Sequence, residues 1–234
     1  MKKVVILQSN YIPWKGYFDL INDADLFIFY DDVQYTKNDW RNRNKIVTPN
    51  GLRWLTIPTG IDAHRLICEV TLHDPSWQTK HWETIRQNYA RSPFFKFYRP
   101  FFEEIYRGKA WTSLSELNQH LIKSISRDLL KIQTAFDDSR NYVLQGHRLE
   151  RLLDLTKQSG ASHYISGPAA KSYIDEAEFT AIDVALQWKD YNGYPEYAQG
   201  PLPFEHGVSI LDTLFNVGPT TDSVIWGWRR PLAA

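Results

Sequence analysis

The stretch KVVILQSNYIPWKGYFDLINDADLFIFYDD, residues 3–32, decides the fold. It starts with a β-branched run at residues 4–7 and closes with a second apolar run at residues 26–30, so both runs are predicted to be buried strands. Residues 16–21, between them, predict a short helix. A strand, a helix and a strand within about 30 residues are typical of a right-handed βαβ unit with parallel strands.

Polar residues follow both predicted strands at the point where each strand ends. Gln8, Ser9 and Asn10 follow the first, and Asp31 and Asp32 follow the second. Ligands of parallel sheets bind at the carboxyl ends of the strands, so these residues predict a site there. Asp31 and Asp32 either hold a divalent cation such as Mg²⁺ or accept a proton in catalysis, or one of them caps the following turn.

The rest of the chain predicts a single α/β domain over residues 1–234. Its sheet is expected to be mostly parallel, with flanking helices, a short antiparallel excursion and a helical insertion at about 74–131. The excursion comprises a hairpin, residues 45–48 and 52–58 around the turn Pro49-Asn50-Gly51, and a third strand-like run at 66–72. Further helices are expected from Ser76, across Pro100, at 113–131, at 149–157, at 169–173 and at 208–215, and further strands at 163–165 and 182–187.

Composition excludes several classes of protein. The 27 basic and 27 acidic residues give a net charge of zero, which argues against binding to nucleic acid through bulk electrostatics. A hydrophobic fraction of 43% and a charged fraction of 23% argue against disorder. The aromatic fraction of 15% is high, and flat rings in such number suit stacking on sugars or bases as well as a core.

Cysteine and histidine usage indicates neither a disulfide nor a bound metal cluster. Cys68 is the single cysteine, and it is expected to be a buried small hydrophobe. The seven histidines form none of the usual zinc-binding spacings. The first apolar run is too short for a signal peptide, and no stretch approaches the roughly 18 apolar residues of a membrane span, so a cytoplasmic protein is expected.

A basic and aromatic cluster, DDVQYTKNDWRNRNK at residues 31–45, contains candidate ligand-binding side chains. Lys37, Arg41 and Arg43 suit a phosphate or carboxylate, Trp40 offers a stacking face, and Asn44 adds an amide. The cluster is either a solvated charged turn or part of a site for an anionic small molecule.

The first loop and the first long helix supply the remaining candidates. Gln8, Asn10, Tyr11 and Trp14 are expected to shape a pocket at the end of the first strand, although the loop has neither a GxGxxG nor a P-loop pattern. Lys80 and His81 form a pair that reaches an anionic ligand, unless His81 is a structural histidine. Ser166-Gly167-Pro168 either presents backbone N–H groups to a ligand or is a plain strand-to-helix turn.

Taken together, these segments resemble the WbqC-like protein family along nearly the whole chain. The resemblance rests on these segments: QSNYIPWKGYFDLI (8–21), FYDDVQYTKNDWRNRNKI (29–46), Trp77 with Lys80-His81, Leu117-Asn118, YISGPAAKSYI (164–174) and SILDTLFNVGP (209–219). The family implies a bacterial cytoplasmic protein associated with surface-polysaccharide biosynthesis of the O-antigen type. It has no agreed set of catalytic residues.

Two hypotheses about function follow. In the first, the protein is a transferase that modifies an activated sugar or glycan with an acyl or aminoacyl group, such as glycine, from a donor that is free or bound to a carrier. In the second, it is a nucleotide- or sugar-nucleotide-binding module that serves a partner enzyme and has no turnover of its own.

Overall fold

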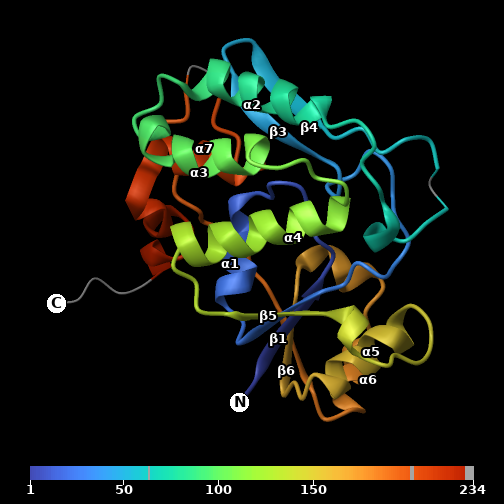
Figure 1. Ribbon diagram of the computed structural model, residues 1–234. Helices are drawn as coiled ribbons and strands as arrows, with labels where there is room; N and C mark the ends of the chain where they lie inside the picture. The colour runs from blue at the N-terminus through green and yellow to red at the C-terminus, as the bar shows by residue number, and fades with distance from the viewer. Residues whose placement is uncertain (63, 201–202, 230–234) are drawn as a thin grey trace.

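The computed structural model describes residues 1–62, 64–200 and 203–229 (Figure 1). A parallel sheet of five strands lies at its centre, in the order β5-β2-β1-β6-β7. The strands are β1 (Lys3–Leu7), β2 (Leu26–Phe29), β5 (Ala135–Asp138), β6 (His163–Ser166) and β7 (Ala185–Trp188). The predicted βαβ unit is confirmed, because α1 (Lys15–Asn22) connects the paired parallel strands β1 and β2.

The strand order contains one reversal of direction. From β1 the chain adds β2 and then β5 on one side, and it later returns to add β6 and β7 on the other side of β1. The connections that leave β1 and β6 therefore run in opposite directions. Their carboxyl ends form a topological switch point, the place where open parallel sheets bind ligands.

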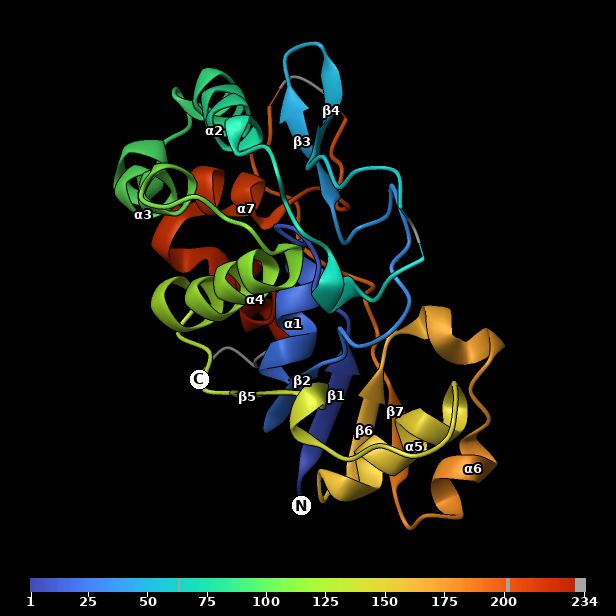
Figure 2. The same cartoon turned by 45° about the vertical axis from the view of Figure 1, so that its right-hand side comes forward.

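Helices cover both faces of the sheet, and β1 shows why. Successive side chains of a strand point to opposite faces. Val5 packs in the same apolar cluster as Leu20 of α1, whereas Val4 and Ile6 pack in a second cluster with Leu155 of α5. Both views place α5 (Leu149–Gln158) and α6 (Glu176–Thr180) on the side away from α1 and α4 (Figures 1 and 2).

The antiparallel excursion is confirmed as a two-stranded hairpin, β3 (Arg43–Thr48) and β4 (Gly51–Thr56). Gly51 has a φ of 114° at the turn, a conformation that favours glycine. The prediction of a third strand at 66–72 is wrong. Ile67–Glu69 forms a short 3₁₀ turn there, and Leu66 and Thr71 make only isolated bridges to other segments. Cys68 lies in that turn and is only half-buried.

The helical segment after residue 74 forms a layer above the sheet (Figure 2). It contains α2 (Ser76–Tyr89), α3 (Phe95–Arg107) and α4 (Leu114–Ser124). Pro100 lies inside α3, as predicted. The predicted single helix at 113–131 is instead α4 followed by a π-helical turn at Ile125–Leu129.

Several short elements were not predicted from the sequence pattern. β5 is an edge strand with the sequence AFDD, and α6 is a short helix that no prediction covered. The strand predicted at 182–187 is present as β7, displaced to Ala185–Trp188. The last long helix is α7 (Ile210–Val217), which packs against α3. None of the helices in the described part of the chain combines the length and the apolar character that a membrane span needs.

Candidate functional site

Asp31 is enclosed by hydrogen bonds beyond the end of β2. Its carboxylate accepts the backbone N–H of Ser9 at 2.8 Å, the Gln119 amide at 3.2 Å and the Ser115 hydroxyl. The Gln119 amide also donates to Asp138, at the end of β5, at 2.8 Å. Burial raises the pKa of Asp31 despite these donors. The carboxylate thus ties the ends of β1, β2 and β5 to helix α4.

Asp32 has a different set of partners from its neighbour. It forms an ion pair with Arg151 of α5 at 2.6 Å and accepts the hydroxyl of Ser139. Arg151 in turn lies over the ring of Tyr30, with its guanidinium carbon 5.4 Å from the ring centre. The two carboxylates are therefore engaged separately. Groups of three or more His, Cys, Asp or Glu side chains suited to a metal ion are absent from the described residues.

The cationic side chains of the predicted basic cluster do not converge on one site. Arg41 pairs with Asp39 at 3.0 Å, Arg43 lies 4.3 Å from the ring centre of Trp54, and Lys37 is exposed. Asn44 is buried and donates to the backbone carbonyls of Tyr11 and Ile12, at 3.2 and 2.8 Å. These contacts shape the hairpin and hold the first loop against it.

Tyr11 and His81 form a buried chain of hydrogen bonds under helix α2. The Tyr11 hydroxyl lies 2.9 Å from Nδ1 of His81 and 2.5 Å from the Tyr106 hydroxyl, and Nε2 of His81 lies 3.2 Å from the Thr56 carbonyl oxygen. Burial lowers the pKa of His81 to about 4. Lys80, the neighbouring residue, is exposed. The structure thus places the two members of the predicted pair in different surroundings.

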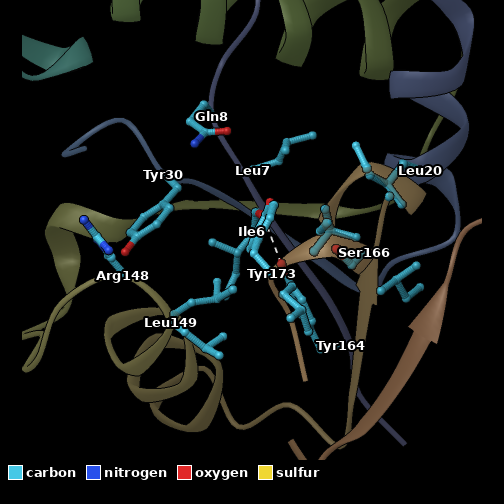
Figure 3. Close-up of a pocket in the computed structure, with 17 residues that line it drawn as sticks. Ile6, Leu7, Gln8, Leu20, Tyr30, Arg148, Leu149, Tyr164, Ser166 and Tyr173 are labelled. Carbon is cyan, nitrogen blue, oxygen red and sulfur yellow. Dashed lines mark hydrogen bonds between the residues drawn. The ribbon is translucent and has the colours of Figure 1, made fainter. Parts of the chain in front are cut away.

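A cavity of about 600 Å³, called here the β1–β6 cavity, opens at the switch point (Figure 3). Its walls come from the ends of β1 and β6, the segment after β6, the start of α5 and Tyr30. The lining residues are Val5, Ile6, Leu7, Gln8, Leu20, Tyr30, Arg148, Leu149, Leu152, Tyr164, Ile165, Ser166, Gly167, Ala169, Ala170, Tyr173 and Ile174. Most are apolar, as is usual for a small-molecule pocket.

Arg148 is the charged residue of this lining, and its backbone is strained. It has a φ of 50° and a ψ of −117° at the N-cap of α5, a region that side chains other than glycine rarely adopt. Its guanidinium makes no ion pair within the part of the chain that the structure describes.

Sequence reasoning found only part of this cavity. Gln8 lines it, and so do Ser166 and Gly167, for which the sequence leaves open a ligand-binding backbone or a plain strand-to-helix turn. Tyr30, Arg148 and Tyr173 were missed. Tyr30 directly follows β2, and Tyr173 lies within YISGPAAKSYI, which the resemblance already included. No sequence pattern marks Arg148, which joins the wall only through the tertiary structure.

Four other predicted residues meet at a second, smaller hollow. The Trp14–Trp40 pocket, about 240 Å³, is lined by Asn10, Pro13, Trp14, Trp40, Asn44 and Gly207. The first loop and the start of the hairpin thus meet there, as the backbone hydrogen bond from Tyr11 to the Trp40 carbonyl also shows.

Lys15 is a buried cation that sequence reasoning did not select. It is 1% exposed, and its Nζ lies 5.1 to 5.3 Å from the ring centres of Tyr194, Tyr197 and Phe204. Burial lowers its pKa to about 8, although Asp212 partly opposes that shift. Tyrosine and phenylalanine faces stabilise such a cation through cation–π contacts.

Comparisons with known proteins give one family and one relative. The model of the WbqC-like protein family matches residues 8–224. The relative is "Uncharacterized protein Rv1507c" of Mycobacterium tuberculosis (strain ATCC 25618 / H37Rv), which is 46% identical over 220 residues. The match covers 93% of this chain and 95% of that protein. No solved structure matches this chain.

Proposed function

The chain belongs to the WbqC-like protein family, and we propose that it is a transferase that modifies an activated sugar destined for a bacterial surface polysaccharide. The nucleotide-linked sugar binds in the β1–β6 cavity. An acyl or aminoacyl group, such as glycine, arrives as a carrier-bound ester or thioester. The observation that carries this proposal is the coincidence of that cavity with the switch point of the sheet.

The size and lining of the cavity support a nucleotide-linked sugar. A volume of about 600 Å³ lies within the range of pockets that enclose ligands larger than a single ring. Tyr30 and Tyr173 supply aromatic faces, and Gln8 supplies an amide beside the end of β1 (Figure 3). Such a lining suits a base and a ribose.

Positive charge supports a ligand that carries phosphate. Arg148 lines the cavity with no carboxylate partner in the described residues. Arg151 stands beside Tyr30, although Asp32 already neutralises it. Arginine binds phosphate through paired N–H groups, so Arg148 is the proposed phosphate ligand.

Asp32 is the better placed of the two carboxylates for proton transfer. Its side chain keeps 14% of its surface exposed, whereas Asp31 is fully buried and holds Ser9. In the proposed step, a sugar hydroxyl or amine attacks the acyl carbonyl and gives its proton to a base. The protonated base then gives that proton to the oxygen or sulfur of the carrier, whose bond to the acyl carbon breaks, and the carrier leaves as an alcohol or a thiol. We assign the base to Asp32 and a positioning role to Asp31.

The second candidate is a sugar-nucleotide-binding module without turnover. It is favoured by one observation, that both carboxylates already have protein partners. A base would have to leave such a partner before it could accept a proton.

Two measurements separate these functions. Isothermal titration with UDP-glucose and GDP-mannose should show binding by the wild type. Arg148→Gln should weaken this binding about tenfold, because it removes one charge-assisted hydrogen bond. Arg99→Gln is the matched control, because Arg99 is an exposed arginine of α3 paired with Glu103. Absence of binding to either sugar nucleotide, or equal binding by both variants, contradicts the assigned site.

Turnover is then measured by mass spectrometry after incubation with the bound sugar nucleotide and acetyl- or glycyl-thioesters. A product heavier by the acyl group, lost in Asp32→Asn while binding is retained, supports the transferase. Binding without any product from these donors supports the module.

A further inference from the structure

The Trp14–Trp40 pocket differs in chemistry from the β1–β6 cavity. Tryptophan and asparagine side chains, with Pro13 and Gly207, make up its lining, and none of these residues is charged. Its volume of about 240 Å³ is less than half that of the cavity. A pocket of this size and neutrality suits a single uncharged ring better than a nucleotide.

Asn10 leaves a hydrogen-bond acceptor unused at this pocket. Its Oδ1 is buried and has no hydrogen-bond partner among the described residues. A buried polar atom without a partner costs about 1–3 kcal/mol, and a water molecule or a ligand hydroxyl would remove that cost. Asn44, by contrast, is held by its bonds to the carbonyls of the first loop.

Aromatic rings extend from the pocket onto the surface of the hairpin. Trp40 is 41% exposed and Trp54 is 42% exposed, and their ring centres lie 5.5 Å apart with an angle of 40° between the planes. The guanidinium of Arg43 lies over Trp54 at 4.3 Å and holds that ring in place. Exposed tryptophans that are fixed in this way offer flat faces to a ligand.

We infer that this pocket and its two exposed tryptophans form a saccharide site, which binds an uncharged sugar unit of a glycan. The apolar face of the sugar ring stacks on Trp40, and one hydroxyl donates to Oδ1 of Asn10. A second sugar unit of the same glycan lies along Trp54. Neutral hydroxyl groups match a lining of amides and indoles that carries no cation for a phosphate.

The position of this site gives it a place in the proposed reaction. Gln8 lines the β1–β6 cavity and Asn10 lines the pocket, only two residues further along one loop. Two residues span at most about 7 Å. The Tyr17 hydroxyl fixes that loop by donating to the Gln8 carbonyl at 2.9 Å. The saccharide site itself does not depend on the proposed function. Only its role in the reaction, which is to hold a glycan beside the activated sugar, rests on that proposal.

The test is saturation-transfer NMR with methyl glycosides of mannose, glucose, galactose and rhamnose at millimolar concentration. We expect ring protons of at least one glycoside to receive saturation from the protein. Trp40→Ala should weaken this binding about tenfold or more, the loss of one aromatic stacking contact. Asn10→Ala tests the hydroxyl contact separately, and Trp40→Phe should restore part of the binding.

Trp228→Ala is the matched control, because Trp228 is a tryptophan of similar exposure, 38%, that does not line the pocket. Circular dichroism checks that each variant is folded. The inference is overturned if no glycoside binds the wild-type protein, or if Trp40→Ala and Trp228→Ala bind alike. The titration with sugar nucleotides uses other residues, so its outcome stands independently of this one.

Discussion

The two halves of the sheet end differently, although the same chain and the same parallel pairing build both. At the ends of β2 and β5, Asp31, Gln119 and Asp138 bond to one another and close the space. At the ends of β1 and β6 the chain leaves the β1–β6 cavity, with Arg148 at its wall. Charged residues beside a strand end therefore do not by themselves indicate a ligand. Here Asp31 and Asp138 hold the strand ends to helix α4, and the apolar half provides the space for binding.

The largest effect on stability is expected from removing the hydrogen bonds at the ends of β2 and β5. Asp31→Ala removes the acceptor of Ser9, Ser115 and Gln119. Because the Ser9 N–H and the Ser115 hydroxyl then lose their buried acceptor, while Gln119 keeps Asp138, we expect the free energy of unfolding to fall by about 3 kcal/mol or more. Urea denaturation measures it. Asp32→Ala, which breaks a partly exposed pair, should cost only about 1 kcal/mol, and equal losses would show that the buried network around Asp31 adds no stability beyond that of an ordinary ion pair.

Acid should destabilise the buried polar chain under α2. Burial holds the pKa of His81 at about 4 in the folded protein, against 6.5 ordinarily. Between those values the unfolded chain binds the proton and the folded chain does not, so stability falls as the pH drops from 6.5 to 4. The loss attributable to His81 is about 3 kcal/mol. This loss is measured by comparing the denaturation midpoints of the wild type and His81→Gln from pH 6.5 to pH 4. If the midpoints of both proteins change with pH in parallel, His81 is not responsible for the loss.

Lys15 should also make stability rise with pH, but in an alkaline window. Its pKa is lowered from 10.5 to about 8, so the unfolded chain holds more protons between those values and stability rises with pH. Below pH 8 the folded protein carries a buried charge. Lys15→Met should therefore gain about 1–3 kcal/mol at pH 7, and the gain should shrink towards pH 10. A gain that is constant with pH would show that packing, not charge, is responsible.

The smallest effect is expected at the wall of the open half. Arg148→Gly relieves a positive φ, so stability should rise by about 1 kcal/mol. The same change removes the proposed phosphate ligand and should weaken binding of UDP-glucose about tenfold. Lys131→Gly is the control, since Lys131 also has a positive φ, 57°, but does not line the cavity. It should gain stability without losing affinity, and similar affinity losses in both variants would argue against a role for Arg148.

The first two strands and the hairpin could be predicted because their signals are local. Apolar runs bounded by turn residues mark β1, β2 and the β3–β4 hairpin. β5 could not be found in this way, since AFDD has no apolar run and becomes a strand only by pairing with β2. The prediction of a strand at 66–72 was wrong for the converse reason. The run is apolar, but its residues are buried without a neighbouring strand to pair with.

The candidate site residues also differ in whether their surroundings could be predicted from local sequence. Asn10, Trp14, Trp40 and Asn44 meet in one pocket, since the loop and the hairpin that carry them are adjacent in the fold. Tyr11 and His81 lie in the core, and Lys37 and Lys80 are exposed at the surface. Residue type indicated what each side chain is able to bind. It did not indicate which side chains would be occupied by partners elsewhere in the chain.

By itself, the sequence determined the α/β class, the parallel βαβ start and the short hairpin, because hydrophobic periodicity and turn residues act over a few neighbouring positions. The tertiary structure alone decided which polar groups are paired and which are left for a ligand. Asp31 is bonded by Gln119, 88 residues away, and Asp32 by Arg151, 119 residues away. Contacts at such separations arise only when the strand order and the helix packing are complete.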